Sequence, residues 1–170
     1  AILGDKNRMS YDAGISYIKN VLEATKTLLK NPNDLDARGI IMMGASLSTS
    51  SRMGIGKEEA YAYDIYELEF LPEKLFGSSY RRSLTSIFPR FLEAMGKRHA
   101  EDVGKYYLDV FGFDSSIEES SRKLVALFSD FGVDMYYDGI INREQVGCIP
   151  CDTELDENEI FEMINGLIRK

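Results

Sequence analysis

Apolar residues recur at intervals of three and four along almost the whole chain, which is the spacing of one buried face of an α-helix. No segment shows the sustained alternation or the two-residue turn pairs that favour β-hairpins. The pattern therefore predicts an all-α protein, a helical bundle. At 170 residues, of which 44% are hydrophobic, the chain has the size of a single domain with one core, which we expect to cover residues 1–170.

The first half of the chain predicts three helices. The first covers about residues 11–30 and ends at Asn31-Pro32, because proline cannot continue a helix. The second covers about residues 34–50, and its run Ile40-Ile41-Met42-Met43-Gly44-Ala45 is apolar on most sides. Such a run predicts a helix through the centre of the bundle, with the small residues Gly44 and Ala45 allowing close helix contact. The third covers about residues 57–71 and ends at Pro72.

The second half predicts further helices with the same apolar spacing. Residues 84–95 carry a strong stripe that contains Pro89, so we expect this helix to bend or divide there. The stripe continues through residues 103–111. Ser116 and Glu119 have the spacing of a capping box and predict the start of a helix that ends at Gly132. Asp156, with an acidic residue three positions later, predicts the start of the last helix.

The charge balance argues against nucleic acid as a partner. Lys and Arg total 20 against 28 Asp and Glu, and the formal net charge of -8 opposes the phosphate backbone. No stretch approaches the roughly 20 apolar residues needed to span a bilayer, and residues 1–6 lack the layout of a signal peptide. We therefore expect a cytoplasmic protein with no membrane or nucleic-acid partner.

Cysteine and histidine are scarce. Cys148 and Cys151 form a C-x-x-C, which suits a redox pair or half of a zinc site. A tetrahedral zinc site needs about four such ligands, and His99 is the single histidine, so a surface loop with reduced thiols is the favoured interpretation. His99 lies in a charged stretch outside the apolar stripe, which predicts a solvated turn and no catalytic role.

Several segments, in order and spacing, resemble the C-terminal helical domain of the iron-containing alcohol dehydrogenases, a family with a dehydroquinate synthase-like fold that includes butanol dehydrogenases and lactaldehyde reductases. The resemblance spans nearly the whole chain. It is carried by Lys30-Asn31-Pro32-Asn33-Asp34-Leu35-Asp36-Ala37-Arg38, Met43-Gly44-Ala45-Ser46-Leu47, Ser86-Ile87-Phe88-Pro89-Arg90-Phe91, Leu127-Phe128-Ser129-Asp130-Phe131-Gly132-Val133 and Leu155-Asp156-Glu157-Asn158-Glu159-Ile160.

The resemblance implies a two-domain enzyme of which this chain holds one part. In the family an N-terminal α/β domain binds NAD(P), and the reaction takes place in the cleft beside the helical domain. Iron or zinc is held there by an aspartate, a histidine four positions later and two histidines fourteen positions apart, and another histidine lies near the substrate. Alignment on Phe88-Pro89 places the later three histidines at Tyr66, Tyr80 and Phe70, so all three are substituted. The aspartate and the first histidine fall at or before residue 1.

These substitutions leave two interpretations of the metal position. A phenol with a pKa near 10 is a poor ligand for ferrous iron or zinc but suits ferric iron, so Tyr66 and Tyr80 with Asp64 or Glu67 describe one hypothetical ferric site. The favoured alternative is that the aromatic rings fill space that a metal occupies in the family. We therefore expect no metal, no cofactor in this chain and no catalytic residue at these positions.

Two further features have a structural and a functional interpretation. Arg81-Arg82 suits the phosphate of a cofactor carried by another domain, although a solvated helix start is the favoured interpretation. Tyr61, Tyr63 and Tyr66 suit a ligand cleft, although aromatic residues at helical spacing are more often core.

Two functions from different classes follow. In the first, the chain is the helical part of an alcohol dehydrogenase-like protein whose upstream domain supplies NAD(P) and whose activity is weak or lost, because hydride transfer needs a Lewis acid. In the second, it is a stand-alone, non-enzymatic domain that binds a ligand or partner or forms a homodimer. An exposed apolar patch would indicate the second function.

Overall fold

The computed structural model describes Leu3 and residues 7–48 and 64–169, and this part of the chain is built from helices. In chain order they are α1 (Arg8–Lys30), α2 (Leu35–Ser48), α3 (Ile65–Leu68), α4 (Phe70–Phe76), α5 (Tyr80–Met95), α6 (Ala100–Tyr106), the π-helical turn η3 (Tyr107–Phe111), α7 (Ile117–Asp130), α8 (Arg143–Gly147) and α9 (Glu157–Asn165). The one β-type contact in these ranges is an isolated parallel bridge between Tyr137 and Ile168. The predicted all-α class is confirmed.

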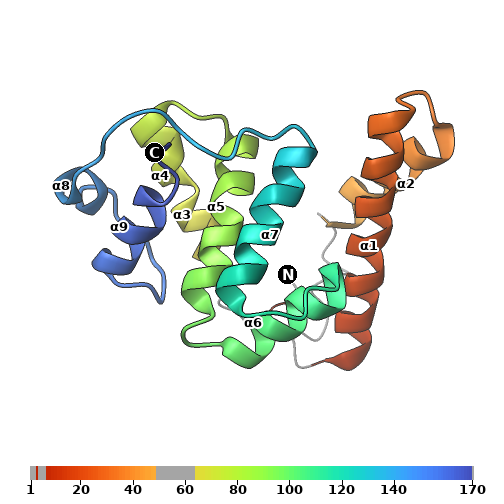
Figure 1. Ribbon diagram of the computed structural model, residues 1–170, viewed down its shortest axis with the longest axis horizontal. Coiled ribbons are helices and arrows are strands. Elements are labelled where there is room, and N and C mark those ends of the chain that lie inside the picture. Colours follow the sequence, from red (N-terminus) through yellow and green to blue (C-terminus); the bar gives the residue numbers. More distant parts are fainter. Residues whose placement is uncertain (1–2, 4–6, 49–63, 170) are drawn as a thin grey trace.

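Helix α5 is the centre of the bundle. It packs against α3, α4, α6, α7 and α9, and Figure 1 shows it beside α7, with α1 and α2 at one edge of the molecule. Ile87, Phe91, Leu92 and Met95 are fully buried, as their helical spacing predicts. The buried stripe of α5 therefore organises the core.

Of the two predicted effects of Pro89, a bend or a division of the helix, the division does not occur, because α5 runs unbroken from Tyr80 to Met95. A proline inside a helix removes one N–H donor and crowds the preceding turn, but packing can offset that cost. Pro89 is buried at the contact with α7, where its carbonyl accepts a hydrogen bond of 2.9 Å from the Ser121 hydroxyl. This contact with α7 is the tertiary context that the local rule lacks.

The first two helices form a hairpin. Helix α1 ends at Lys30 as predicted and begins at Arg8, three residues before the predicted start, because the Asn7 side chain caps its first turn. Helix α2 lies against α1, and a Cβ atom built on Gly44 would stand 3.0 Å from Val21 Cγ2, which confirms the predicted close contact at this residue.

The predicted position of α2 at the centre of the bundle is wrong. Met42 and Met43 are 74% and 67% exposed, and α1 is the only described helix against which α2 packs extensively. The apolar run shows that the helix is hydrophobic on many sides. It does not show how many other helices pack against it.

The predicted end of the third helix at Pro72 is also wrong. The backbone stays in the right-handed helical region at Glu69, and α4 begins at Phe70 with Pro72 in its first turn. A proline there removes an N–H that has no partner within the helix, so it favours a helix start. Gly77 then ends α4 with a φ of 63°, which a glycine adopts without strain. Residues 57–63 of the predicted helix lie outside the described part.

The helix starts predicted in the second half are confirmed. The Ser116 hydroxyl accepts from the Glu119 N–H at 3.2 Å at the start of α7. Asp156 accepts from the N–H groups of Asn158 and Glu159, and the Glu159 carboxylate accepts from the Asp156 N–H, so a complete capping box opens α9.

Within the described ranges, no helix combines the length and the apolar character that a bilayer crossing requires.

Candidate functional site

Tyr66, Phe70 and Tyr80, which the resemblance aligns with the family's histidines, lie where α3, α4 and α5 meet. Because Glu69 continues the helical path between α3 and α4, Tyr66, Glu69, Phe70 and Glu73 have the i, i+3, i+4, i+7 spacing of one helical face. Both short helices pack against α5, which begins at Tyr80. We call Tyr66, Glu69, Phe70, Glu73 and Tyr80 the Glu69 cluster.

The charges of this cluster act on one another. The Glu69 carboxylate, followed by burial and then by Tyr66 and Glu73, raises the pKa of the Tyr80 phenol above its ordinary value of 10.0. Such an effect requires the side chains to be close, since charge interactions weaken rapidly with distance near a surface. The phenol of Tyr80 therefore keeps its proton at neutral pH.

The aromatic rings of the cluster do not fill an interior space. Tyr66, Phe70 and Tyr80 are 47%, 45% and 51% exposed, so about half of each side chain faces outward. The interior position belongs instead to a carboxylate, because Glu69 is only 4% exposed.

Glu69 and Glu73 are the residues that sequence reasoning missed. Glu69 Oε2 and Glu73 Oε1 are buried and have no hydrogen-bond partner. Burial, followed by the charge of Glu73, raises the pKa of Glu69 above its ordinary value of 4.5. The available signal was a glutamate inside the apolar sequence Leu68-Glu69-Phe70-Leu71.

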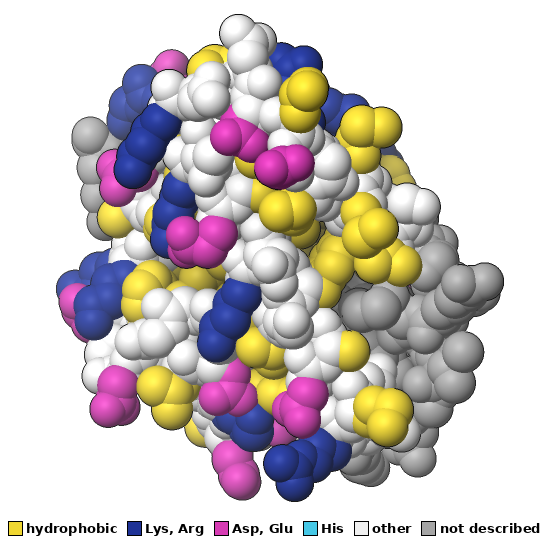
Figure 2. Space-filling model, turned by 90° about the vertical axis from the view of Figure 1, so that its right-hand side faces the viewer, with side chains coloured by type: hydrophobic (Ala, Val, Ile, Leu, Met, Phe, Trp, Pro, Cys, Tyr) yellow, Lys and Arg dark blue, Asp and Glu magenta, His cyan; other side chains and the backbone are white. Residues whose placement is uncertain are grey.

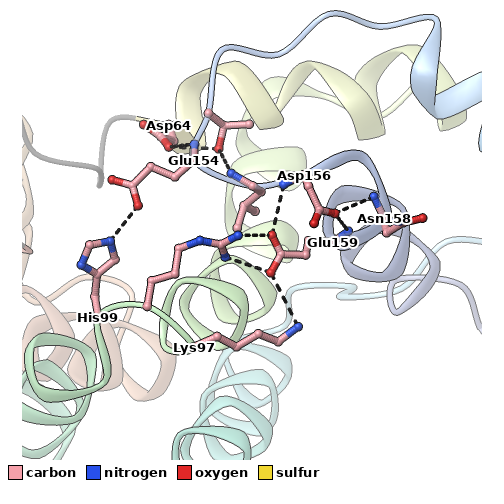
Figure 3. A network of polar contacts seen from close by, with 10 residues as sticks. Asp64, Lys97, His99, Glu154, Asp156, Asn158 and Glu159 are labelled. Atoms are coloured by element: carbon pink, nitrogen blue, oxygen red, sulfur yellow. Dashed lines mark hydrogen bonds and ion pairs between the residues drawn. The ribbon is translucent and has the colours of Figure 1, made fainter.

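Of the two carboxylates proposed for a ferric site, Asp64 has another role. Asp64 accepts hydrogen bonds from the Thr153 hydroxyl at 2.9 Å and from the Glu154 N–H at 2.8 Å, so it fixes the segment before α9 to the start of α3 (Figure 3). Glu67 is exposed. The hypothetical ferric site thus loses the carboxylate that Asp64 was to supply.

Tyr66, Phe70 and Tyr80 do not fit the iron or zinc that the resemblance implies. Phe70 offers no donor atom, Tyr80 holds its proton, and no imidazole is present in the cluster. In the part of the chain that the structure describes, no group of three or more His, Cys, Asp and Glu residues is arranged to hold a metal ion.

His99 belongs to a polar network on the α9 side of the molecule. Its Nε2 lies 2.8 Å from the Glu154 carboxylate, and the neighbouring Arg98 donates to Glu159 at 2.8 Å (Figure 3). His99 is half-buried at the start of α6, so its setting is a bonded turn and is less solvated than predicted. The network joins the turn after α5 to the start of α9.

The side chain of Arg82 is bound within the chain, whereas the favoured prediction was a solvated helix start. It donates to the Asp134 carboxylate at 2.8 Å and to the carbonyls of Asp134 and Tyr136, and its guanidinium lies 4.3 Å from the ring centre of Tyr137. These contacts engage Arg82 within the chain, whereas Arg81 is exposed. Tyr61 and Tyr63, the other candidates for a ligand cleft, lie outside the described residues.

The two cysteines are free thiols in the segment that follows α8. Cys148 is exposed and Cys151 is partly buried. Burial, followed by the charge of Glu67, raises the pKa of Cys151 above its ordinary value of 9.0, so this thiol is protonated at neutral pH. The arrangement agrees with a surface segment.

Comparison with known proteins shows the fold. No protein-family model and no curated protein matches the chain. Among solved structures, NADH-dependent butanol dehydrogenase A of Thermotoga maritima is similar with a TM-score of 0.79 and 14% sequence identity, over 98% of this chain and 48% of that protein. The chain therefore spans about half of the butanol dehydrogenase and has the fold of the helical C-terminal region of an alcohol dehydrogenase-type protein.

Proposed function

We propose that this chain is the helical half of a protein like the iron-containing alcohol dehydrogenases, in which metal-dependent hydride transfer has been lost. The observation that carries the proposal is the donor set of the Glu69 cluster, which has two phenols and a phenyl ring where the resemblance predicts three histidines. NAD(P) binding would belong to an upstream nucleotide-binding domain.

The chemical reason is the need for a Lewis acid. Removing a hydride from an alcohol builds negative charge on the alcohol oxygen, which a bound metal stabilises by several kcal/mol. A neutral phenol offers one hydrogen bond at that place, and Phe70 offers nothing. The carboxylates of Glu69 and Glu73 would oppose the developing negative charge.

Metal content is the direct test. Purified protein is incubated with zinc or, without oxygen, with ferrous iron, dialysed, and analysed for bound metal. We expect no stoichiometric metal in the natural chain. Combining Tyr66→His, Phe70→His and Tyr80→His should raise the affinity for zinc by about 100-fold or more. The matched control replaces the same three residues by glutamine, which is polar but a weak zinc ligand.

Two results would contradict the loss of function. One is stoichiometric iron or zinc in the natural protein after dialysis. The other is oxidation of NADH or NADPH by this chain with short aldehydes and added metal.

The second candidate function, self-association, is favoured by one observation. Figure 2 looks at the side of the molecule where α1 and α2 lie, and hydrophobic side chains gather on it. The exposed large hydrophobic residues of these two helices include Leu29, Leu35, Ile40, Met42 and Met43. From Ile40 to Ser48 the chain has no charged residue, so two copies of this helix can meet without the repulsion that a net charge of -8 imposes elsewhere.

Sedimentation velocity over a concentration series tests this second function. The natural chain should form dimers as its concentration rises, and Met42→Ser with Met43→Ser should remain monomeric, because about two methionine side chains of apolar surface are lost from each copy. Ile140→Ser is the matched control, since Ile140 is exposed in the loop before α8. A natural chain that stays monomeric throughout would reject self-association.

A further inference from the structure

Glu69 and Glu73 form a pair of carboxylates that the described chain does not neutralise. They lie four positions apart on one helical face, and no described Lys, Arg or His forms an ion pair with either. Each has a buried oxygen without a hydrogen-bond partner, and the Glu69 side chain is more than nine-tenths buried. Such a pair leaves a local excess of negative charge.

Burying a carboxylate without a partner is unfavourable, and placing a second one beside it adds repulsion. A structural carboxylate in this position would normally meet an arginine, a lysine or backbone N–H groups, as Asp64 and Glu159 do in this chain. The two orphan oxygens therefore indicate that the natural partner comes from outside the described chain.

The surroundings of the pair fit an organic cation better than a metal ion. Half-exposed rings of Tyr66, Phe70 and Tyr80 flank the carboxylates on the same face or at the start of α5. Aromatic faces attract ammonium groups and contact alkyl chains. A magnesium or calcium ion would need about six oxygen ligands, and the cluster offers two carboxylates and two phenols, of which that of Tyr80 keeps its proton.

The arrangement also distinguishes between organic cations. The unpaired oxygens belong to two different carboxylates, one from each residue. An ammonium group has three N–H donors around a single nitrogen and can reach two separate oxygens, whereas the planar guanidinium group is matched to both oxygens of one carboxylate.

We propose that the Glu69 cluster binds an alkylammonium group, which donates hydrogen bonds to Glu69 and Glu73 while its alkyl chain lies against the rings of Tyr66 and Tyr80. The group is either a free primary amine or a lysine side chain of another protein, which share this chemistry.

The test is a titration of the full chain with n-butylammonium chloride, followed by amide NMR shifts at constant ionic strength against potassium chloride. We expect saturable binding, with a dissociation constant on the order of 1 mM for one charged group and its ring contacts, and shifts confined to α3, α4 and the start of α5. Potassium chloride should give no saturable change, because a potassium ion donates no hydrogen bond.

Variants locate the site. Glu69→Gln and Glu73→Gln should each weaken binding at least about tenfold, since each removes one charge-assisted hydrogen bond. Glu67→Gln is the matched control: it removes an exposed charge from the same segment and should leave binding unchanged. Unchanged amide shifts outside the cluster show that a variant is folded, and a folded Glu69→Gln that binds butylammonium normally would overturn the proposal.

Two further titrations identify the source of the group and exclude a metal. Tighter binding of an acetylated and amidated lysine than of butylammonium supports a lysine of a partner protein, and equal binding supports a free amine. Zinc or manganese that binds at the same residues and displaces butylammonium at micromolar concentration would overturn the proposal in favour of a metal site.

Discussion

At the scale of single residues, Glu159 and Glu69 show how position decides the behaviour of a carboxylate. Hydrogen bonds from Arg98 hold the pKa of Glu159 below its ordinary value of 4.5, because they favour the charged form. Burial and the charge of Glu73 raise the pKa of Glu69 above the same value, because they disfavour the charged form. The two glutamates therefore contribute to stability with opposite dependence on pH.

Glu159→Gln should reduce the loss of stability in acid. A lowered native pKa means that the contribution of Glu159 is present above pH 4.5 and is lost as pH falls through the lowered native value. Denaturant unfolding between pH 7 and pH 3 measures this, and the variant should be less stable than the natural chain at pH 7 and change less on acidification. Glu157→Gln, an exposed neighbour in the first turn of α9, should reproduce the natural pH profile.

Glu69→Gln should stabilise the protein at neutral pH. A raised native pKa means that the folded state favours the protonated form, so the contribution of Glu69 is full below pH 4.5 and is lost as pH rises through the native value. Removing the buried charge should raise the free energy of unfolding at pH 7 by on the order of 1 kcal/mol, with the gain vanishing in acid. A variant less stable than the natural chain at pH 7 would show that Glu69 has a compensating partner.

At the scale of elements, the helix caps could be predicted from the sequence, because a cap depends on residues three positions apart. The Asp156 carboxylate accepts from two N–H groups and the Asp156 N–H donates to the Glu159 carboxylate, whereas the Ser116 hydroxyl accepts from one N–H group. Asp156→Ala should therefore cost about 1–2 kcal/mol of stability and Ser116→Ala about 0.5–1 kcal/mol. Thermal unfolding of the two variants measures the order, and equal losses would mean that the reciprocal bond contributes nothing.

What the sequence could not supply at this scale was the number of neighbours of each element. The same apolar content that correctly predicted a buried α5 wrongly predicted a central α2, because hydrophobicity records what a helix can bury and not what the fold places beside it. The predicted division at Pro89 and the predicted helix end at Pro72 are wrong for a related reason. The local rule describes an isolated helix, whereas α7 supports Pro89, and Pro72 falls in a first turn.

The candidate site was half predictable. Alignment with a family placed Tyr66, Phe70 and Tyr80 at one location, and the structure gathers them where α3 and α4 pack on α5. The carboxylates of Glu69 and Glu73 were not predicted as site residues, because charged residues at helical spacing usually face solvent. Only the packing of the short helices reveals that Glu69 is buried and that its oxygen lacks a partner.

At the scale of the whole molecule, the hairpin of α1 and α2 lies at one edge of the bundle around α5. Its attachment includes the contact of α1 with η3, where the Tyr11 hydroxyl donates to the Asp109 carboxylate at 2.9 Å and Lys105 lies 3.9 Å from the Tyr11 ring centre. Helix α2 buries few side chains, whereas α5 is fully buried at Ile87, Phe91 and Met95. Regions with few buried apolar contacts open at lower free energy than the core.

Native-state hydrogen exchange should therefore divide the molecule in two. In the monomeric fraction, amides of α2 should exchange at least about tenfold faster than those in the middle of α5, since α2 can open without disturbing the core. Tyr11→Phe, which removes the hydrogen bond to Asp109, should accelerate exchange in α1 and α2 and leave α5 unchanged. Equal protection of α2 and α5, or acceleration of both by Tyr11→Phe, would show that hairpin and bundle unfold as one cooperative unit.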